Sequence, residues 1–312
     1  MKRLTRRLTR RLPVLVALLL FGSGCAAFSD DTASDPAGDD ELSVTAAFYP
    51  LQYVAQRVTG DLAEVANLTQ PGGEPHDLTL SVAETAELAG SDLVVYEADF
   101  QPAVDAAVEQ NAGGDVLDVS GAVDLMPVSE DAEAQDTEEG GLDPHFWQDP
   151  SRMAALGDAV ADRLSDLDPD HAETYAANAA TLRGDLEALD TEFTDTLATC
   201  ARTTIVVSHD AFGYLGRYGL EIEPIAGLSP DAEPTPADLG RLQQVIDDDG
   251  ITTVFSERLV SPALSESLAQ DKGITTAILD PIEGLSDETA DQDYLSLMRA
   301  NLAALEEANG CA

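Results

Sequence analysis

Short apolar runs alternate with amphipathic stretches along most of the chain after residue 41. Runs of β-branched and aromatic residues bounded by turn residues are typical of strands, and apolar residues at three- and four-residue steps are typical of helices. We therefore expect strands at 42–49, 64–68, 92–97, 204–208, 221–225, 252–256 and 274–279. Helices are expected at 51–59, 79–89, 102–110, 236–248, 262–270 and 292–308. The alternation of strands and helices predicts an α/β protein with parallel, doubly wound sheets.

The clearest helical periodicity lies in the middle of the chain. Apolar residues recur at helical steps through 153–167, and a second series follows at Tyr175, Ala179, Leu182, Leu186, Leu189, Phe193 and Leu197. Asp168 and Pro169 stand between the two series, and aspartate followed by proline is a good start for a helix. A helix over 169–198 would be about 45 Å long, which is enough to run the full height of a two-lobed molecule.

Length and charge restrict the possible architecture and partners. At 312 residues the chain favours about two domains of 100 to 150 residues each. The formal net charge is −43, although residues 1–24 hold six of the 16 basic residues and no acidic one. The remainder is therefore strongly acidic and repels nucleic acid and anionic membranes. We expect neither as a partner.

The first 24 residues are typical of a secretory signal peptide. Basic residues are followed by an apolar run at 12–24, which is too short to span a bilayer. Cys25 follows the sequence FGSG, which resembles the lipobox of bacterial lipoproteins, although Gly22 stands where leucine is preferred. Cleavage after Ala27 is the alternative. Residues 25–41 are small and polar, which predicts a disordered tether. We expect an extracytoplasmic protein, either a cell-surface lipoprotein anchored by a lipid on Cys25 or a periplasmic or secreted protein.

Two cysteines remain after the leader, Cys200 and Cys311. In an exported protein an even pair is a candidate disulfide. The alternative is two unpaired thiols, since nothing in the sequence fixes the distance between them.

Four potential metal ligands occupy comparable places: His76, His145, His209 and Asp280. Three of them follow predicted strands, and His145 lies in a stiff segment between Pro144 and Pro150. In open α/β sheets ligands bind outside the carboxyl ends of the strands, so all four side chains can converge on one crevice. Imidazole and carboxylate are the ligands that Zn²⁺ takes in a tetrahedral site.

Each of these residues also has an ordinary explanation. A single loop histidine is usually solvated, and the sequence Asp280-Pro281 could simply start a turn. Glu257 also follows a strand and could be a fifth oxygen ligand or an acceptor behind a ligand. His171 lies in the first turn of the long helix, away from any strand end, and is not included.

Several segments together resemble the metal-binding substrate-binding proteins of bacterial ABC importers, the zinc and manganese group. The segments are EPHD at 74–77, DPHFWQDP at 143–150, VVSHDAFGYL at 206–215, LDP at 279–281, YAANA at 175–179 and GLSPDAEP at 227–234. The resemblance covers roughly 42–310. It implies two doubly wound α/β lobes joined by one long rigid helix, with the metal site between the lobes.

By position, the resemblance assigns the four metal ligands to His76, His145, His209 and Asp280. Manganese-type members are similar but place a glutamate where His209 stands, and imidazole suits Zn²⁺ better than a hard-oxygen ion. We therefore expect Zn²⁺ as the transported ligand, with Mn²⁺ or Fe²⁺ as the alternative. The acidic run 130–139 stands where zinc-type relatives carry a histidine-rich loop, but it contains no histidine, which argues against a role in metal capture.

The resulting hypothesis is a monomeric protein that captures Zn²⁺ with high affinity and delivers it to an ABC-type membrane permease, without enzymatic activity. Its parts would be a signal peptide (1–24), a tether (25–41), an N-terminal lobe (42–150), a helical segment (151–200) and a C-terminal lobe (201–312). Coordinating imidazoles must be deprotonated, so the affinity should fall as the pH drops through about 6.5. The alternative is an exported zinc hydrolase, which would keep an open coordination position. No His-Glu-x-x-His motif and no nucleophile elbow supports that alternative.

Overall fold

The computed structural model of the protein describes residues 42–128 and 141–312. The expected signal peptide, the tether with Cys25 and the acidic run 130–139 lie outside the described residues. Residues 41–312 group into one compact unit by their contacts. The predicted lobe boundaries at residues 150 and 200 therefore remain predictions.

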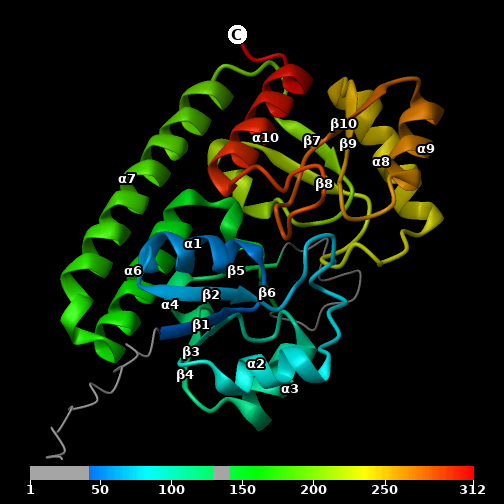
Figure 1. Ribbon diagram of the computed structural model, residues 1–312. Helices are drawn as coiled ribbons and strands as arrows, with labels where there is room; N and C mark the ends of the chain where they lie inside the picture. Colours follow the sequence, from blue (N-terminus) through cyan, green and yellow to red (C-terminus); the bar gives the residue numbers. More distant parts are fainter. Residues whose placement is uncertain (1–41, 129–140) are drawn as a thin grey trace, which may run out of the picture. The chain divides into compact units, whose positions relative to one another are not determined.

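Two parallel four-stranded sheets organise the chain (Figure 1). The first sheet has the order β2-β1-β3-β4, with β1 (Leu42–Ala46), β2 (Ala63–Asn67), β3 (Leu93–Tyr96) and β4 (Asp115–Asp118). The second has the order β10-β9-β7-β8, with β7 (Thr204–Val207), β8 (Glu221–Pro224), β9 (Thr253–Ser256) and β10 (Thr275–Ile278). A short antiparallel pair joins β5 (Met126–Pro127) to β6 (Leu142–Asp143). The predicted α/β class with doubly wound parallel sheets is confirmed.

Helices connect the strands and cover the sheets. The first half contains α1 (Tyr49–Thr59), α2 (Val82–Gly90), α3 (Pro102–Asn111) and α4 (Ser120–Val123). The middle contains the 3-10 turn η1 (Phe146–Gln148), α6 (Pro150–Leu167), the 3-10 turn η2 (Pro169–His171) and α7 (Ala172–Leu197). The second half contains the 3-10 helix η3 (Gly213–Tyr218), α8 (Pro236–Asp249), α9 (Ala263–Lys272) and α10 (Tyr294–Asn309). We call the first sheet with α1–α4 the N-terminal lobe and the second sheet with α8–α10 the C-terminal lobe.

The two sheets share one topology. In each, the first strand lies centrally, the second strand pairs on one side of it, and the third and fourth follow on the other side. The strand order therefore reverses between β1 and β3 in one lobe and between β7 and β9 in the other, while all strands stay parallel. These switch points are where open parallel sheets form ligand crevices, at the carboxyl ends of the strands.

Helix α7 connects the two lobes (Figure 1). It packs along α6 and contacts α1 on the N-terminal side and α10 and η3 on the C-terminal side. The seven apolar positions of its predicted periodicity are all buried, in one continuous core that also contains Val44 from β1 and Phe255 from β9. At 26 residues α7 is about 39 Å long. The long linking helix is confirmed, with a 3-10 turn in place of the first three residues of the predicted span.

Some elements differ from the sequence-based expectation, and α4 and the β5–β6 pair were not predicted. The first strand ends at Ala46 rather than at residue 49, because Tyr49 already begins α1 with Pro50 in its first turn, where proline is well tolerated. Strand β4 was not predicted. It is a four-residue edge strand that begins and ends with aspartate, and so lacks the apolar run of a buried strand.

Cys200 and Cys311 form a disulfide in the structure. It ties the segment after α7 to the C-terminus, where Arg202 also donates a hydrogen bond to the carbonyl of Ala308. The bond closes a loop of 111 residues, and constraining such a loop in the unfolded chain contributes roughly 4 to 5 kcal/mol in the chain-entropy description.

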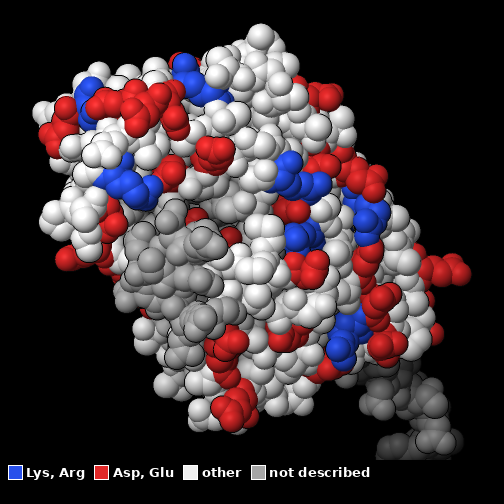
Figure 2. All heavy atoms as spheres, turned by 180° about the vertical axis from the view of Figure 1, so that it is seen from behind, with Lys and Arg blue, Asp and Glu red and all other residues white. Residues whose placement is uncertain are grey.

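The basic side chains of the described chain are engaged by carboxylates. Each basic residue of the described chain except Arg202 has an ion pair with an aspartate or glutamate. On the face in Figure 2, basic groups accordingly lie beside acidic ones. Among residues 42–128 and 141–312, no helix combines the length and hydropathy needed to cross a membrane.

Helices α6 and α7 are tightly packed at Gly157. A Cβ atom placed there would lie 3.2 Å from Cδ2 of Leu182, so a larger side chain must displace Leu182. We expect Gly157→Leu to lower the free energy of unfolding by about 1 to 3 kcal/mol through overpacking. Equilibrium urea unfolding of the purified chain measures this change.

Gly184 on α7 supplies the matched control. It is exposed, and a Cβ atom there would have no neighbour within 4 Å. Gly184→Ala should raise the free energy of unfolding by up to about 1 kcal/mol, since alanine is the better helix former. An equal loss of stability in both variants would contradict the close helix contact at Gly157.

Candidate metal centre

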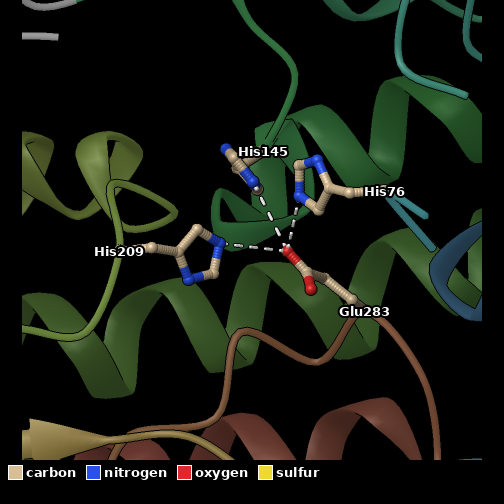
Figure 3. Close-up of side chains that lie close together, drawn as sticks. All are labelled: His76, His145, His209 and Glu283. Atoms are coloured by element: carbon tan, nitrogen blue, oxygen red, sulfur yellow. Dashed lines mark ion pairs between the residues drawn. The ribbon is translucent and has the colours of Figure 1, made fainter. Parts of the chain in front are cut away.

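Four side chains from four separate loops meet between the lobes (Figure 3). His76 lies in the loop after β2, and His145 directly precedes η1. His209 follows β7 by two residues, and Glu283 lies in the loop after β10. One ligand atom from each residue falls within 4.8 Å of the others. The carboxyl ends of strands in both sheets thus supply one common site.

The distances within this group match a tetrahedral cation site. The Nε2 atoms of His76, His145 and His209 each lie 3.4 Å from the same atom, Oε1 of Glu283. In a regular tetrahedron with metal-ligand distances of about 2.0 to 2.2 Å, neighbouring ligand atoms lie about 3.3 to 3.6 Å apart. The three nitrogen–oxygen distances are therefore those expected for ligands that share one divalent cation.

All four ligand atoms are buried and lack a hydrogen-bond partner among the described residues. The side chains of His145, His209 and Glu283 are 0%, 0% and 1% exposed, while that of His76 is 12% exposed. Burying polar atoms without partners is costly. A bound cation would remove that cost for all four at once.

The opposite ring nitrogens of two histidines are held by carboxylates. Nδ1 of His145 lies 2.8 Å from Oδ1 of Asp143, and Nδ1 of His209 lies 2.5 Å from Oε1 of Glu257. A proton on Nδ1 leaves the lone pair of Nε2 directed at the centre, as in the carboxylate-histidine pairs behind many metal sites. Of the two roles open to Glu257 from the sequence, the structure places it behind His209 rather than among the four facing atoms.

The pKa values of all four side chains are shifted from their ordinary values. Burial lowers the pKa of His145 and His209, but the carboxylates on both sides outweigh it and raise the pKa of His145 to about 9 and that of His209 to about 10. Burial lowers the pKa of His76. Burial opposes ionisation of Glu283, yet the three imidazoles that face it hold its pKa well below the ordinary value. Without a cation, protons on His145 and His209 would offset part of the negative charge of the neighbouring carboxylates at neutral pH.

Asp280, the carboxylate predicted as a ligand, is not among the four facing atoms. Its Oδ2 lies 3.1 Å from Nε of Arg258, and its Oδ1 accepts a hydrogen bond from the backbone N–H of Ile282 at 2.8 Å. The backbone N–H and carbonyl of Asp280 both bond to the side chain of Asn301. Asp280 therefore anchors the turn, while Glu283, three residues later, faces the histidines.

The turn between Asp280 and Glu283 has an unusual backbone. Ile282 is fully buried and has a φ of +61°, a left-handed conformation that is unfavourable for a β-branched residue. The neighbouring carbonyl of Pro281 accepts hydrogen bonds from Nε1 of Trp147 at 2.7 Å and Nε2 of Gln148 at 2.5 Å. The segment at 143–150 thus holds the turn that delivers Glu283. The presence of a glutamate in the loop after Asp280 was visible in the sequence, but this backbone geometry was not.

A family model described as "Zinc-uptake complex component A periplasmic", ZnuA, matches residues 44–308. Among curated relatives, the chain is 34% identical over 307 residues to "Zinc-binding lipoprotein AdcA" of Streptococcus pneumoniae, covering 93% of this chain and 60% of that protein. It is 30% identical over 305 residues to "High-affinity zinc uptake system protein ZnuA" of Bacillus subtilis, covering 94% and 95% of the two chains. The chain thus spans about 60% of the length of the AdcA protein but nearly all of the Bacillus protein.

Solved structures give a consistent result. The Zn(II)-bound ZnuA-like domain of Streptococcus pneumoniae AdcA aligns with a TM-score of 0.72 and 31% identity, over 86% of this chain and 99% of that domain. The laminin-binding protein Lbp of Streptococcus pyogenes aligns with a TM-score of 0.74 and 28% identity, over 86% and 99% of the two chains.

Proposed function

Since the chain belongs to the ZnuA family of periplasmic zinc-uptake components, we propose that it captures Zn²⁺ outside the cytoplasm and delivers it to the membrane permease of an ABC importer. The observation that carries this proposal is the group of three imidazole nitrogens, each 3.4 Å from one carboxylate oxygen. The names of the zinc-binding and zinc-uptake relatives support it.

The ligands in this proposal are His76, His145, His209 and Glu283. Three nitrogens and one oxygen at tetrahedral spacing suit Zn²⁺, which binds imidazole and carboxylate in that geometry. Mn²⁺ and Fe²⁺ are the alternative cargo within the same importer type. Mn²⁺ favours more oxygen ligands and an octahedral arrangement, so this donor set favours zinc.

The geometry of the site fits transport of a bound cation better than catalysis. A catalytic zinc site keeps one position open for water beside three protein ligands, whereas the four protein atoms here could fill all four positions of a tetrahedral site. Capture and release need no covalent step. We therefore propose that the protein is not an enzyme and that Zn²⁺ is its cargo.

The sequence also indicates where in the cell the protein would act. The leader at 1–24 directs export, and a lipid on Cys25 would hold the protein at the membrane near its permease, while cleavage after Ala27 would leave it free. In either form we propose that it acts as a monomer, because the four proposed ligands come from one chain.

The two candidate carboxylates can be separated by substitution. Glu283→Gln removes the charge that faces the three imidazoles and should lower Zn²⁺ affinity at least about a hundredfold. Asp280→Asn keeps an acceptor for the N–H of Ile282 and loses the ion pair with Arg258, so affinity should fall by less than about tenfold. Competition with a chelator of known affinity measures both constants.

The same measurement tests the proposed function. Wild-type protein should bind one Zn²⁺ per chain and prefer it to Mn²⁺. Failure of the wild-type chain to bind Zn²⁺ would refute zinc carriage. A large loss in Asp280→Asn together with none in Glu283→Gln would refute the ligand assignment alone.

Zinc binding should release about two protons at pH 7.5, because a protonated Nε2 cannot coordinate and both His145 and His209 have a raised pKa. The affinity should therefore rise with pH throughout the range from 6 to about 9, rather than level off above 6.5. Calorimetric titration in buffers of different ionisation enthalpy counts the released protons.

Asp143→Asn is the control for this effect. It keeps a hydrogen-bond acceptor at Nδ1 of His145 but removes the negative charge that raises the pKa, so fewer protons should be released at pH 7.5. Proton release near zero in the wild-type protein would contradict the assigned protonation.

A further inference from the structure

Each lobe places a buried glutamate directly after the third strand of its sheet. Glu97 follows β3 and Glu257 follows β9, and the two strands hold equivalent places in the common topology. Glu257 bonds to Nδ1 of His209, which comes two residues after β7. The equivalent place, two residues after β1, is taken by Phe48. The N-terminal lobe therefore has the glutamate without the histidine that pairs with it in the C-terminal lobe.

Glu97 is buried without a hydrogen-bond partner. Its residue is 2% exposed, and both carboxylate oxygens lack a partner among the described residues. Burial, with smaller contributions from Asp143 and Asp118, raises its pKa well above the ordinary value. A buried carboxyl group with no partner is costly to keep, and such groups are retained mainly where they have a function.

Glu97 lines a cavity of about 700 Å³ that also reaches the proposed zinc ligand His76. Further lining residues include Asp99 and Phe100 from the N-terminal lobe and Ser229 from the C-terminal half. The cavity lies beyond the carboxyl end of β3, beside the switch point of the first sheet. It thus adjoins the metal centre on the side of His76, the one proposed ligand with appreciable solvent exposure.

We propose that Glu97 and this cavity form a second, transient binding site for a divalent cation, which holds the ion on its way to and from His76. This inference rests on the proposed function. A hydrated cation must lose water before four protein atoms can surround it, and a carboxylate oxygen can replace part of that water one step earlier. Exposed Asp99 adds negative charge at the cavity and attracts cations from solution. Burial raises the pKa of Glu97, so an arriving cation would compete with protons for this carboxyl group.

The experiment follows zinc binding by stopped-flow fluorescence of Trp147, the only tryptophan of the chain. Its ring centroid lies 5.3 Å from that of His145, so coordination should change its emission. In the full chain with Glu97→Gln, we expect the association and dissociation rate constants for Zn²⁺ to fall together by about tenfold. The dissociation constant stays within about twofold, because a site on the path changes both rates equally.

Glu109→Gln is the matched control, since Glu109 is exposed on α3 and is not among the residues that line the cavity. It removes one charge from the same lobe and should leave both rate constants unchanged. Asp99→Asn, which keeps a residue type tolerant of the φ of +67°, should slow association to a smaller extent. It also provides the test if Glu97→Gln fails to fold, as judged by circular dichroism.

Unchanged rate constants in Glu97→Gln would overturn the inference and leave zinc carriage intact. A weaker equilibrium affinity at an unchanged association rate would also overturn it, because Glu97 would then act on the bound state. Absence of any zinc-dependent signal together with absence of binding by chelator competition would instead refute the proposed function.

Discussion

The structure between the lobes depends on one buried negative charge, the carboxylate of Glu283 facing three imidazoles. A carboxylate that is 1% exposed is stable only if positive charge lies close to it. Within 42–128 and 141–312, no lysine or arginine forms an ion pair with it. Its neighbours are the nitrogens of His76, His145 and His209, whose charge depends on protons or on a metal. The charge of Glu283 is therefore balanced either by protons on the histidines or by a bound metal ion.

The two lobes around this charge share a core. Helix α7 buries its apolar face against elements of both lobes, and the main core is continuous across them. The loop of Glu283 is held in addition by Trp147 and Gln148 through the carbonyl of Pro281. The backbone N–H of Gly72, in the loop of His76, also bonds to the carbonyl of Leu285 at 2.6 Å. These contacts connect the loops of His76 and Glu283 to each other and to the segment of Trp147, although the three segments are far apart in the sequence.

The sequence predicted the fold and three of the four facing side chains, two of them from their place after strands and His145 from its stiff segment between Pro144 and Pro150. Parallel strands bring their carboxyl ends to one edge, so residues that follow strands, such as His209, converge without any short motif. The fourth side chain could not be found in this way. Asp280 follows β10 more closely than Glu283 does, and only the left-handed turn at Ile282 directs the later residue to the histidines. The edge strand β4 was missed because edge strands need no apolar run, which was the signal used.

The charge balance explains how a site with this many buried carboxylates can both bind and release a cation. Asp143, Glu257 and Glu283 place three carboxylates around the imidazoles. Without a metal, protons on His145 and His209 supply two positive charges, consistent with pKa values of about 9 and 10. A divalent cation supplies the same two charges at one point. Exchange of two protons for one cation therefore leaves the net charge of the buried region unchanged, so binding adds no new buried charge. The carboxylates behind the histidines thus raise the affinity of the imidazoles for protons, and in the proposed function local acidity would favour release of the bound cation.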